Sequence, residues 1–377
     1  MITPICKRAV VAGWRWICSL LLASSASAAA ANAGPSSAHG LELIPVVDLH
    51  VDLSFQVNYK HQAPATASGQ LVASRLLEAG VVGLVLPLYI PHEVSPSGPR
   101  MADLESSYAS MLRVLTGTPP YTAPDQPNEP DRVETWFSFE GAAPFSDRLQ
   151  DVKTWVDRGV KIWGLVHVHD NALATSAGAG PNRIAHKTGL SSAGHALVQA
   201  VHAAGGFIDV SHASDSAVLD VIEHARHDRV PVVATHSNAN RLAPHARNLT
   251  DEQLRAIAST GGVIGVNFHG KFLARGRRAT VADVVQQIRY IADLVGVEHV
   301  ALGSDYEGGI APPKGLEDAR GYQALARALF ASGLSREDIR RVFAGNALRL
   351  LSSQSRTTKA QYSDRARINP CSFDHDS

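Results

Sequence analysis

The chain has 377 residues, of which 45% are hydrophobic and 19% charged, and its 35 Lys and Arg residues balance 35 Asp and Glu residues. This composition is typical of a folded globular protein with a substantial core and excludes an intrinsically disordered chain. The balanced charge argues against a nucleic-acid-binding surface or a polybasic membrane patch. The number of histidines, 17, is unusually high, and their positions indicate where a functional site could lie.

The N-terminus has the pattern of a targeting segment. Basic residues precede an apolar run at residues 16–23, and small residues follow at 26–30, as in a signal peptide with its cleavage site. The run is shorter than the roughly 20 residues of a membrane-spanning helix, so a retained anchor is the weaker alternative. We predict a signal peptide over residues 1–33, export to the periplasm or medium of a bacterial cell, and no stable membrane insertion after cleavage.

Cysteine usage limits the kind of metal site. Cys6 and Cys18 lie in the leader, which leaves Cys371 as the single cysteine of the mature chain. An intrachain disulfide is then excluded and a thiolate-ligated metal is disfavoured. Any metal must be held by histidines and carboxylates.

Residues 41–352 alternate β-type apolar runs with amphipathic helical patterns. Near-continuous apolar strands imply a parallel sheet covered on both faces, and roughly eight such units predict an α/β fold of the (β/α)₈ (TIM) barrel type. The rival, a doubly wound open sheet, would carry a glycine-rich turn after its first strand, and none is present. The predicted strands are 45–50, 81–89, 135–140, 160–167, 207–212, 230–236, 262–269 and 299–305, and helical patterns cover 191–204, 214–227, 250–260 and 280–295.

Two segments do not fit the alternation. Residues 91–130 are rich in Pro, Gly and Ser around a helix-like centre at 102–115, which predicts an elaborated loop over one end of the barrel. Residues 353–377 are polar and lack apolar periodicity, which predicts a disordered tail.

Histidines and carboxylates collect where the predicted strands end. In this barrel the carboxyl ends of the strands converge on one mouth, where the chemistry is done. Taken singly, each residue could be a hydrogen-bonded histidine, a helix cap or a turn residue. If six strand ends carried such side chains, several polar groups would be buried without hydrogen-bonding partners, which is costly. A bound cation would provide a common partner for them. The residues are His50 with Asp52, Glu140, His167, His212, His236 and Asp305.

The donor types indicate the metal and the reaction. Imidazole and carboxylate ligands without thiolate suit zinc or a similar divalent ion. In the first motif, His50 and Asp52 fall on the same face of a strand because the alternation has period two. A carboxylate can bridge two such ions, and a pair of ions shares a hydroxide that is nucleophilic at neutral pH. The pattern therefore predicts a hydrolase.

These motifs resemble those of the membrane dipeptidase (renal dipeptidase) family of zinc peptidases, which have an amidohydrolase-like barrel. The resemblance runs in order from about Val46 to Leu351. It is carried by Asp48–Leu53 (DLHVDL), Ser138–Gly141 (SFEG), Leu165–Asn171 (LVHVHDN), Ile208–Ser214 (IDVSHAS), Ala234–Ala239 (ATHSNA), Arg247–Asp251 (RNLTD), Gly265–Phe268 (GVNF), Leu302–Tyr306 (LGSDY), Gly315–Asp318 (GLED) and Gly345–Arg349 (GNALR).

The resemblance implies a zinc-dependent dipeptidase that cleaves dipeptides with free termini through a metal-bridging hydroxide. It implies two zinc ions, with His50 and Asp52 holding one, His212 and His236 holding the other, and Glu140 bridging both. It also suggests a homodimer, because members of the family commonly pair.

Three further residues receive roles from the resemblance. His167 resembles the residue that stabilises the developing oxyanion, and Arg247 the one that receives the substrate's terminal carboxylate. Asp305 resembles the acid/base that handles the proton of the bridging water and lies near the substrate's free amine. An Arg fork can bind a carboxylate through two hydrogen bonds, which agrees with short substrates that have free ends.

The sequence departs from the family beside the expected pocket. Val51 replaces a common Asn, Ala142–Ala143 replaces Gly-His, His269 replaces Tyr, and Glu307 replaces Asp. None of these changes removes an expected ligand, so they bear on substrate preference more than on reaction type.

Two alternatives of other classes stay open at this point. One is another binuclear amidohydrolase, such as a deacetylase, lactonase, phosphotriesterase or β-lactam-opening enzyme. Many deacetylases, lactonases and phosphotriesterases have His-x-His on the first strand and a bridging modified Lys on the fourth. This chain has His-x-Asp on the first strand, and Lys161 begins the fourth. An inactive binding barrel would be expected to have lost a ligand or the acid/base.

Overall fold

The computed structural model describes residues 43–95, 98–124, 126, 131–183 and 188–352. The predicted signal peptide (1–33) and tail (353–377) lie outside the described residues. Within the described ranges, none of the helices combines the length and apolar character needed to cross a membrane.

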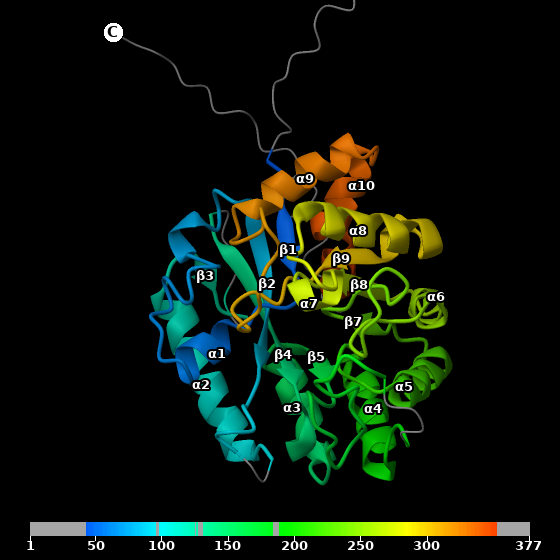
Figure 1. Ribbon diagram of the computed structural model, residues 1–377. Coiled ribbons are helices and arrows are strands. Elements are labelled where there is room, and N and C mark those ends of the chain that lie inside the picture. Colours follow the sequence, from blue (N-terminus) through cyan, green and yellow to red (C-terminus); the bar gives the residue numbers. More distant parts are fainter. Residues whose placement is uncertain (1–42, 96–97, 125, 127–130, 184–187, 353–377) are drawn as a thin grey trace, which may run out of the picture. The chain divides into compact units, whose positions relative to one another are not determined.

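Eight parallel strands form a closed barrel (Figure 1). β1 (Val46–Asp48) pairs with both β2 (Val81–Leu88) and β9 (Val300–Leu302), and β2 also pairs with β4, which closes the ring. The predicted (β/α)₈ barrel is therefore confirmed, and each predicted strand overlaps an observed one. The remaining strands are β4 (Val133–Glu140), β5 (Val160–Gly164), β6 (Phe207–Asp209), β7 (Val233–Ala234) and β8 (Val263–Val266).

The segment predicted as an elaborated loop contains more regular structure than expected. Its helix, α2, runs over Met101–Gly117, and β3 (Tyr121–Thr122) pairs in parallel with the first two residues of β4, Val133 and Glu134. A strand of two residues is too short to show an alternating pattern, so it could not be predicted from the sequence.

Helices surround the strands, and several begin at side-chain caps. The hydroxyl of Ser191 accepts the N–H of Gly194 at the start of α4 (Ser192–Ala204), and Ser214 does the same for Ala217 in α5 (Asp215–Asp228). These caps satisfy N–H groups that a helix leaves unpaired. The other α-helices of the described residues are α1 (Leu53–Asn58), α3 (Val152–Asp157), α6 (Asp251–Ser259), α7 (Gly270–Leu273), α8 (Val281–Val295), α9 (Gly321–Ala331), α10 (Arg336–Arg340) and α11 (Asn346–Ser352). Short 3-10 helices form at η1 (Ala73–Arg75), η2 (Ala143–Phe145), η3 (Leu149–Asp151) and η4 (Val297–His299), and a π-helical segment, η5 (Arg341–Gly345), precedes α11.

Apolar side chains fill the barrel from its N-terminal end. One buried cluster lies inside the ring and includes Val47, Ile162 and Phe207 from the strands together with Leu350 from α11. Asn346, at the start of α11, donates hydrogen bonds to the carbonyls of Val297 and Val300 beside β9. Because this end is packed, the polar groups of the interior are confined to the opposite, C-terminal end.

Candidate active site

All the residues singled out from the sequence meet at the C-terminal end of the barrel. Glu140 is the last residue of β4, whereas the histidines and Asp305 follow their strands by two or three residues. The predicted strands were therefore too long at their carboxyl ends. The functional residues there lie beyond the last paired residue of each strand, at the C-terminal opening of the barrel. A cavity of about 560 Å³ is lined there by Asp52, Glu140, His167, His212, His236, Arg247 and Asp305.

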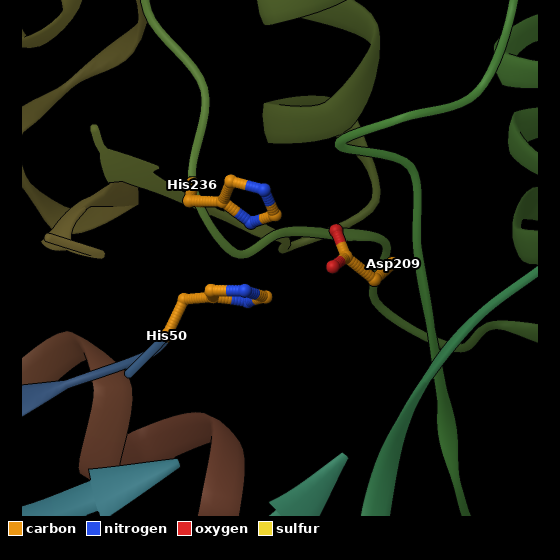
Figure 2. A group of neighbouring side chains, drawn as sticks. All are labelled: His50, Asp209 and His236. Atoms are coloured by element: carbon orange, nitrogen blue, oxygen red, sulfur yellow. The ribbon is translucent and has the colours of Figure 1, made fainter. Parts of the chain in front are cut away.

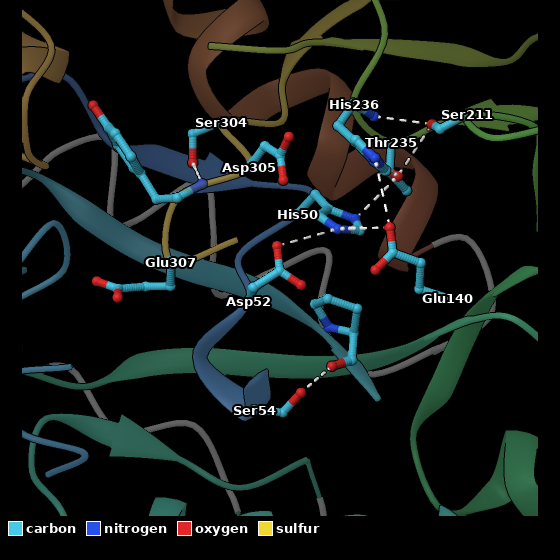
Figure 3. Close-up of polar contacts among 12 residues, drawn as sticks. His50, Asp52, Ser54, Glu140, Ser211, Thr235, His236, Ser304, Asp305 and Glu307 are labelled. Atoms are coloured by element: carbon cyan, nitrogen blue, oxygen red, sulfur yellow. Dashed lines mark hydrogen bonds and ion pairs between the residues drawn. The ribbon is translucent and has the colours of Figure 1, made fainter. Parts of the chain in front are cut away.

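Glu140 lies at the centre of the cluster. Its Oε1 atom is 3.0 Å from Nε2 of His212, 3.5 Å from Nε2 of His50 and 3.7 Å from Nε2 of His236. Nε2 of His167 lies slightly farther away, at 3.9 Å. Four imidazole nitrogens from four different strands therefore converge on one carboxylate oxygen, as Figure 3 shows for His50 and His236.

A second set of ligand-type atoms adjoins the first. Nε2 of His50 is 3.6 Å from Oδ2 of Asp52, and Asp305 completes a group whose ligand atoms lie within 4.8 Å of one another. Glu140, His212 and His236 form another such group. The five expected ligands thus lie close together, with Asp305 beside His50 and Asp52, and Asp209 forms a third such group with His50 and His236.

The far side of the imidazoles is held by Thr235 and Asp209, to which the sequence analysis assigned no role. The hydroxyl of Thr235 donates a hydrogen bond to the carboxylate of Asp209. Its oxygen can therefore act only as an acceptor toward the two histidines, for the N–H groups at Nδ1 of His236 at 2.8 Å and Nδ1 of His50 at 3.3 Å. Both histidines then keep a lone pair on Nε2, which faces Glu140. Figure 2 shows Asp209 facing the two rings. The motif from Asp209 to His212 was visible in the sequence, but the contact of Asp209 with Thr235 forms only between neighbouring strands.

Asp48 plays a similar structural part between β1 and β9. Its buried carboxylate accepts the N–H groups of His50 and Ser304 at 3.0 and 2.9 Å and the hydroxyl of Tyr322. One side chain thereby fixes the two chain segments that carry His50 and Asp305.

Burial and mutual charge set the protonation states. Burial acts to raise the pKa of Glu140, but the adjacent imidazoles of His167, His50 and His236 outweigh it and the pKa lies below its ordinary value. Burial holds the pKa of His212 and His236 well below the usual range of histidine. A carboxylate with neutral imidazoles at neutral pH is the state that binds a metal ion.

Asp305 differs from Glu140 in its electrostatic setting. Burial raises its pKa to about 6, against the opposing influence of His50. The amide of Asn267 donates to its Oδ2 at 3.0 Å and fixes the orientation of the carboxyl. A carboxyl with a pKa near neutrality can both accept and donate a proton.

Arg247 is buried beside the histidines. Its Nη2 donates to Nε2 of His236 at 2.8 Å, while its Nη1 is buried without a hydrogen-bond partner among the described residues. Burial lowers the pKa of Arg247 to about 10, so the guanidinium remains charged at neutral pH. A buried cation with an unpaired donor is suited to bind an anionic group in the cavity.

The donor set fits a divalent metal. Two ligands on one tetrahedral zinc ion lie about 3.3 Å apart, and the distances from Glu140 Oε1 to His212 and His236 are 3.0 and 3.7 Å. Nε2 of His50 is buried and has no hydrogen-bond partner among the described residues, which is costly unless another group satisfies it. Fold and site together define a metal-dependent hydrolase built on a (β/α)₈ barrel.

Comparison with known sequences shows to which family of metal-dependent hydrolases the chain belongs. The chain belongs to the membrane dipeptidase family (Peptidase family M19), whose sequence model matches residues 38–364. It is accordingly a metallopeptidase of the dipeptidase type. The family resemblance read from the motifs is confirmed.

The chain is also similar to individual proteins. A Klebsiella pneumoniae protein described only by its position in the pqqA 5′ region is 38% identical over 56% of this chain and 79% of its own length. The dipeptidase aclJ of Aspergillus oryzae is 33% identical over 59% of this chain, and the match spans about half of that relative (52%). A Rhodobacter sphaeroides metallopeptidase, solved with a phosphinate mimic of the dipeptide L-Ala-D-Ala, is 26% identical and aligns with a TM-score of 0.70 over 82% of this chain and 99% of its own.

Proposed function

We propose that the protein is an exported zinc dipeptidase that hydrolyses dipeptides with free termini. The observation that carries the proposal is the convergence of four imidazole nitrogens within 3.9 Å of one oxygen of Glu140. The metal-dependent dipeptidase class follows from the family, whereas the identity and number of the ions and the roles of single residues are proposed here. Export rests on the signal peptide predicted from the sequence.

Five residues would hold the ions. His50 and Asp52 form one set, His212 and His236 the other, and Glu140 faces both. When bound, a pair of zinc ions supplies Lewis acidity and makes a water molecule nucleophilic at neutral pH. Thr235 assists by directing Nε2 of His50 and His236 toward the site.

Arg247 would select the substrate's C-terminal carboxylate. Its free Nη1 and its burial make a carboxylate a better partner than a neutral group. The cavity of about 560 Å³ is of a size to hold a dipeptide, and the Rhodobacter relative was solved with a dipeptide mimic.

Two further residues would act on the reacting bond. His167 lines the cavity beside Glu140, so its ring can donate a hydrogen bond to the carbonyl oxygen as negative charge develops there. Asp305 would accept the proton of the attacking water and deliver it to the departing amine nitrogen. Its carboxylate lines the same cavity as Arg247 and also suits contact with the free amino group of the substrate.

The test compares substrates that differ only at their ends. Zinc-loaded protein should cleave a free dipeptide and lose most of its kcat/KM on the same dipeptide with an amidated C-terminus. Arg247→Ala should lower the activity on the free dipeptide by about 10²-fold and remove the preference over the amide, corresponding to about 3 kcal/mol of charge-assisted hydrogen bonding. Arg247→Lys, which keeps the charge, serves as the matched control and should retain part of the preference. Equal activity of the wild type on free and amidated dipeptides would contradict the assignment.

A further inference from the structure

A second group of histidines lies on the outside of the barrel, between α4 and α5, which are neighbours in Figure 1. His195 and His202 are seven residues apart on α4 and therefore share one face of the helix. On α5, Asp220, His224 and Asp228 follow one another at intervals of four residues and also share one face. The two faces meet along their length.

The contacts between these faces are short. Nδ1 of His195 lies 2.8 Å from Nε2 of His224, with ring centroids 5.1 Å apart. Two turns further along α4, Nδ1 of His202 lies 2.7 Å from Oδ2 of Asp228. His195 is exposed and His224 is partly buried, so solvent reaches the pair of histidines. The contact between His202 and Asp228 lies next to this pair along the two helices.

Two facing imidazole nitrogens can be satisfied in two ways. One ring can donate a proton to the other, or both lone pairs can bind a cation. Burial, followed by the electrostatic influence of His195, lowers the pKa of His224, which favours a neutral ring at this position at neutral pH. Ligands in adjacent positions of a six-coordinate zinc or nickel ion lie about 3 Å apart, which is close to the observed 2.8 Å.

We propose that His195 and His224 form a second, surface site for a divalent transition-metal ion of the zinc type, separate from the active site. The carboxylates of Asp220 and Asp228, one turn to either side of His224, together with Glu223 place negative charge around the pair and so favour a cation there. Water would complete the coordination. The ion at this site would take no part in the proposed peptide hydrolysis.

The position of the site gives the ion a structural role. It would join α4, which precedes β6, to α5, whose N-cap Ser214 follows His212 by two residues. An ion bound to the folded state alone stabilises it in proportion to its occupancy. The site would therefore stiffen the helix pair that supports the active-site segment around His212.

The test measures zinc binding by the metal-loaded enzyme and by variants of the pair. His195→Gln, His224→Gln and the double variant are dialysed against buffered zinc beside wild type, with His227→Gln as the matched control, because His227 is an exposed histidine of the same helix that contacts Asp228 rather than His195. Wild type and His227→Gln should bind about one zinc equivalent more than the double variant, and each single variant should bind that ion at least roughly tenfold more weakly. Hydrolytic activity should stay within twofold of wild type throughout, since neither histidine lines the active-site cavity.

A residue-level measurement separates this site from the active site. Zinc should protect His195 and His224, but not His227, from modification by diethyl pyrocarbonate, as mapped by mass spectrometry of the peptides. Equal zinc stoichiometry in wild type and double variant, or equal modification of the pair with and without zinc, would overturn the proposal and leave a plain hydrogen bond between two imidazoles. Both readouts are independent of peptide hydrolysis.

Discussion

Glu307 accepts a hydrogen bond from the backbone N–H of Leu71 at 2.8 Å and thereby ties the loop after β9 to the loop before β2. Its second carboxylate oxygen accepts the N–H of Ser68 at 2.8 Å, and the amide of Gln56 donates to its carbonyl. Glu307 and Asp305 both have left-handed backbone conformations, with φ of 70° and 65°. Non-glycine residues adopt this conformation at an energetic cost, so the buried contacts of Glu307 help to hold Asp305 in place.

Removal of this carboxylate should weaken both stability and catalysis. Glu307→Ala leaves the buried N–H of Leu71 without a partner and frees the turn, so we expect the free energy of unfolding to fall by about 2–4 kcal/mol and kcat to fall as Asp305 loses its position. Urea unfolding and steady-state kinetics measure the two effects. Glu307→Gln keeps one acceptor oxygen and should lie between Ala and wild type. A wild-type unfolding midpoint in Glu307→Ala would show that the contact contributes nothing.

The order of the strands and the positions of the active-site residues could be predicted from the sequence, because both depend on local patterns of apolar and polar residues. The apolar runs gave all eight barrel strands, and the polar residues that interrupt them, such as His50 and Asp305, marked the carboxyl ends. In a barrel these ends must converge, so the meeting of distant residues followed from the fold class alone.

The contacts around the ligands could not be predicted in the same way. Asp209 reaches Thr235 across two adjacent strands, and Glu307 reaches Leu71 from 236 positions away in the sequence. Such contacts depend on register and side-chain direction, which single-sequence patterns do not determine. The buried contact between Arg247 and His236 is of the same kind.

Asp305 provides the most direct test of proton transfer. Asp305→Asn preserves the shape of the side chain and can still contact Asn267, but it cannot take up a proton. We expect it to retain the metal content of wild type and to lose about 10²-fold or more in kcat. Metal analysis and steady-state kinetics on the same preparation provide the measurement. A variant with normal kcat would reduce Asp305 to a structural residue.

Glu140 should matter for both metal ions together. Its Oε1 atom is the point on which His50, His212 and His236 converge, so Glu140→Ala would remove the residue that we propose to bridge the two ions. We expect the variant to lose both zinc ions, whereas His212→Ala should mainly affect one. Zinc content after dialysis, measured by elemental analysis, distinguishes these outcomes. Unchanged stoichiometry in Glu140→Ala would refute the bridging role.

Thr235 allows the orientation of the ligands to be tested without changing a ligand. Thr235→Val keeps the side-chain volume but leaves Nδ1 of His236 without its acceptor at 2.8 Å. We expect zinc affinity to fall about 10–100-fold, as is usual when the hydrogen-bond partner of a ligating histidine is removed. Thr235→Ser keeps the hydroxyl and is the matched control. Competition with a chelator of known affinity measures the change, and equal affinities of the Val and Ser variants would contradict the role.

His269 gives the protein a predictable sensitivity to acid. Burial, with the nearby charge of Lys271, lowers its pKa to about 4, and its Nδ1 faces the N–H of Ala311, which requires a neutral ring. The unfolded chain has the ordinary pKa of about 6.5, so between these values it binds the proton more readily than the folded state. The stability from this group is therefore complete above pH 6.5 and is lost as the pH falls toward 4. Thermal unfolding of zinc-free wild type and His269→Gln across this range, with metal release excluded by chelation, should give a shallower decline in Tm for the variant, and parallel curves would contradict the assignment.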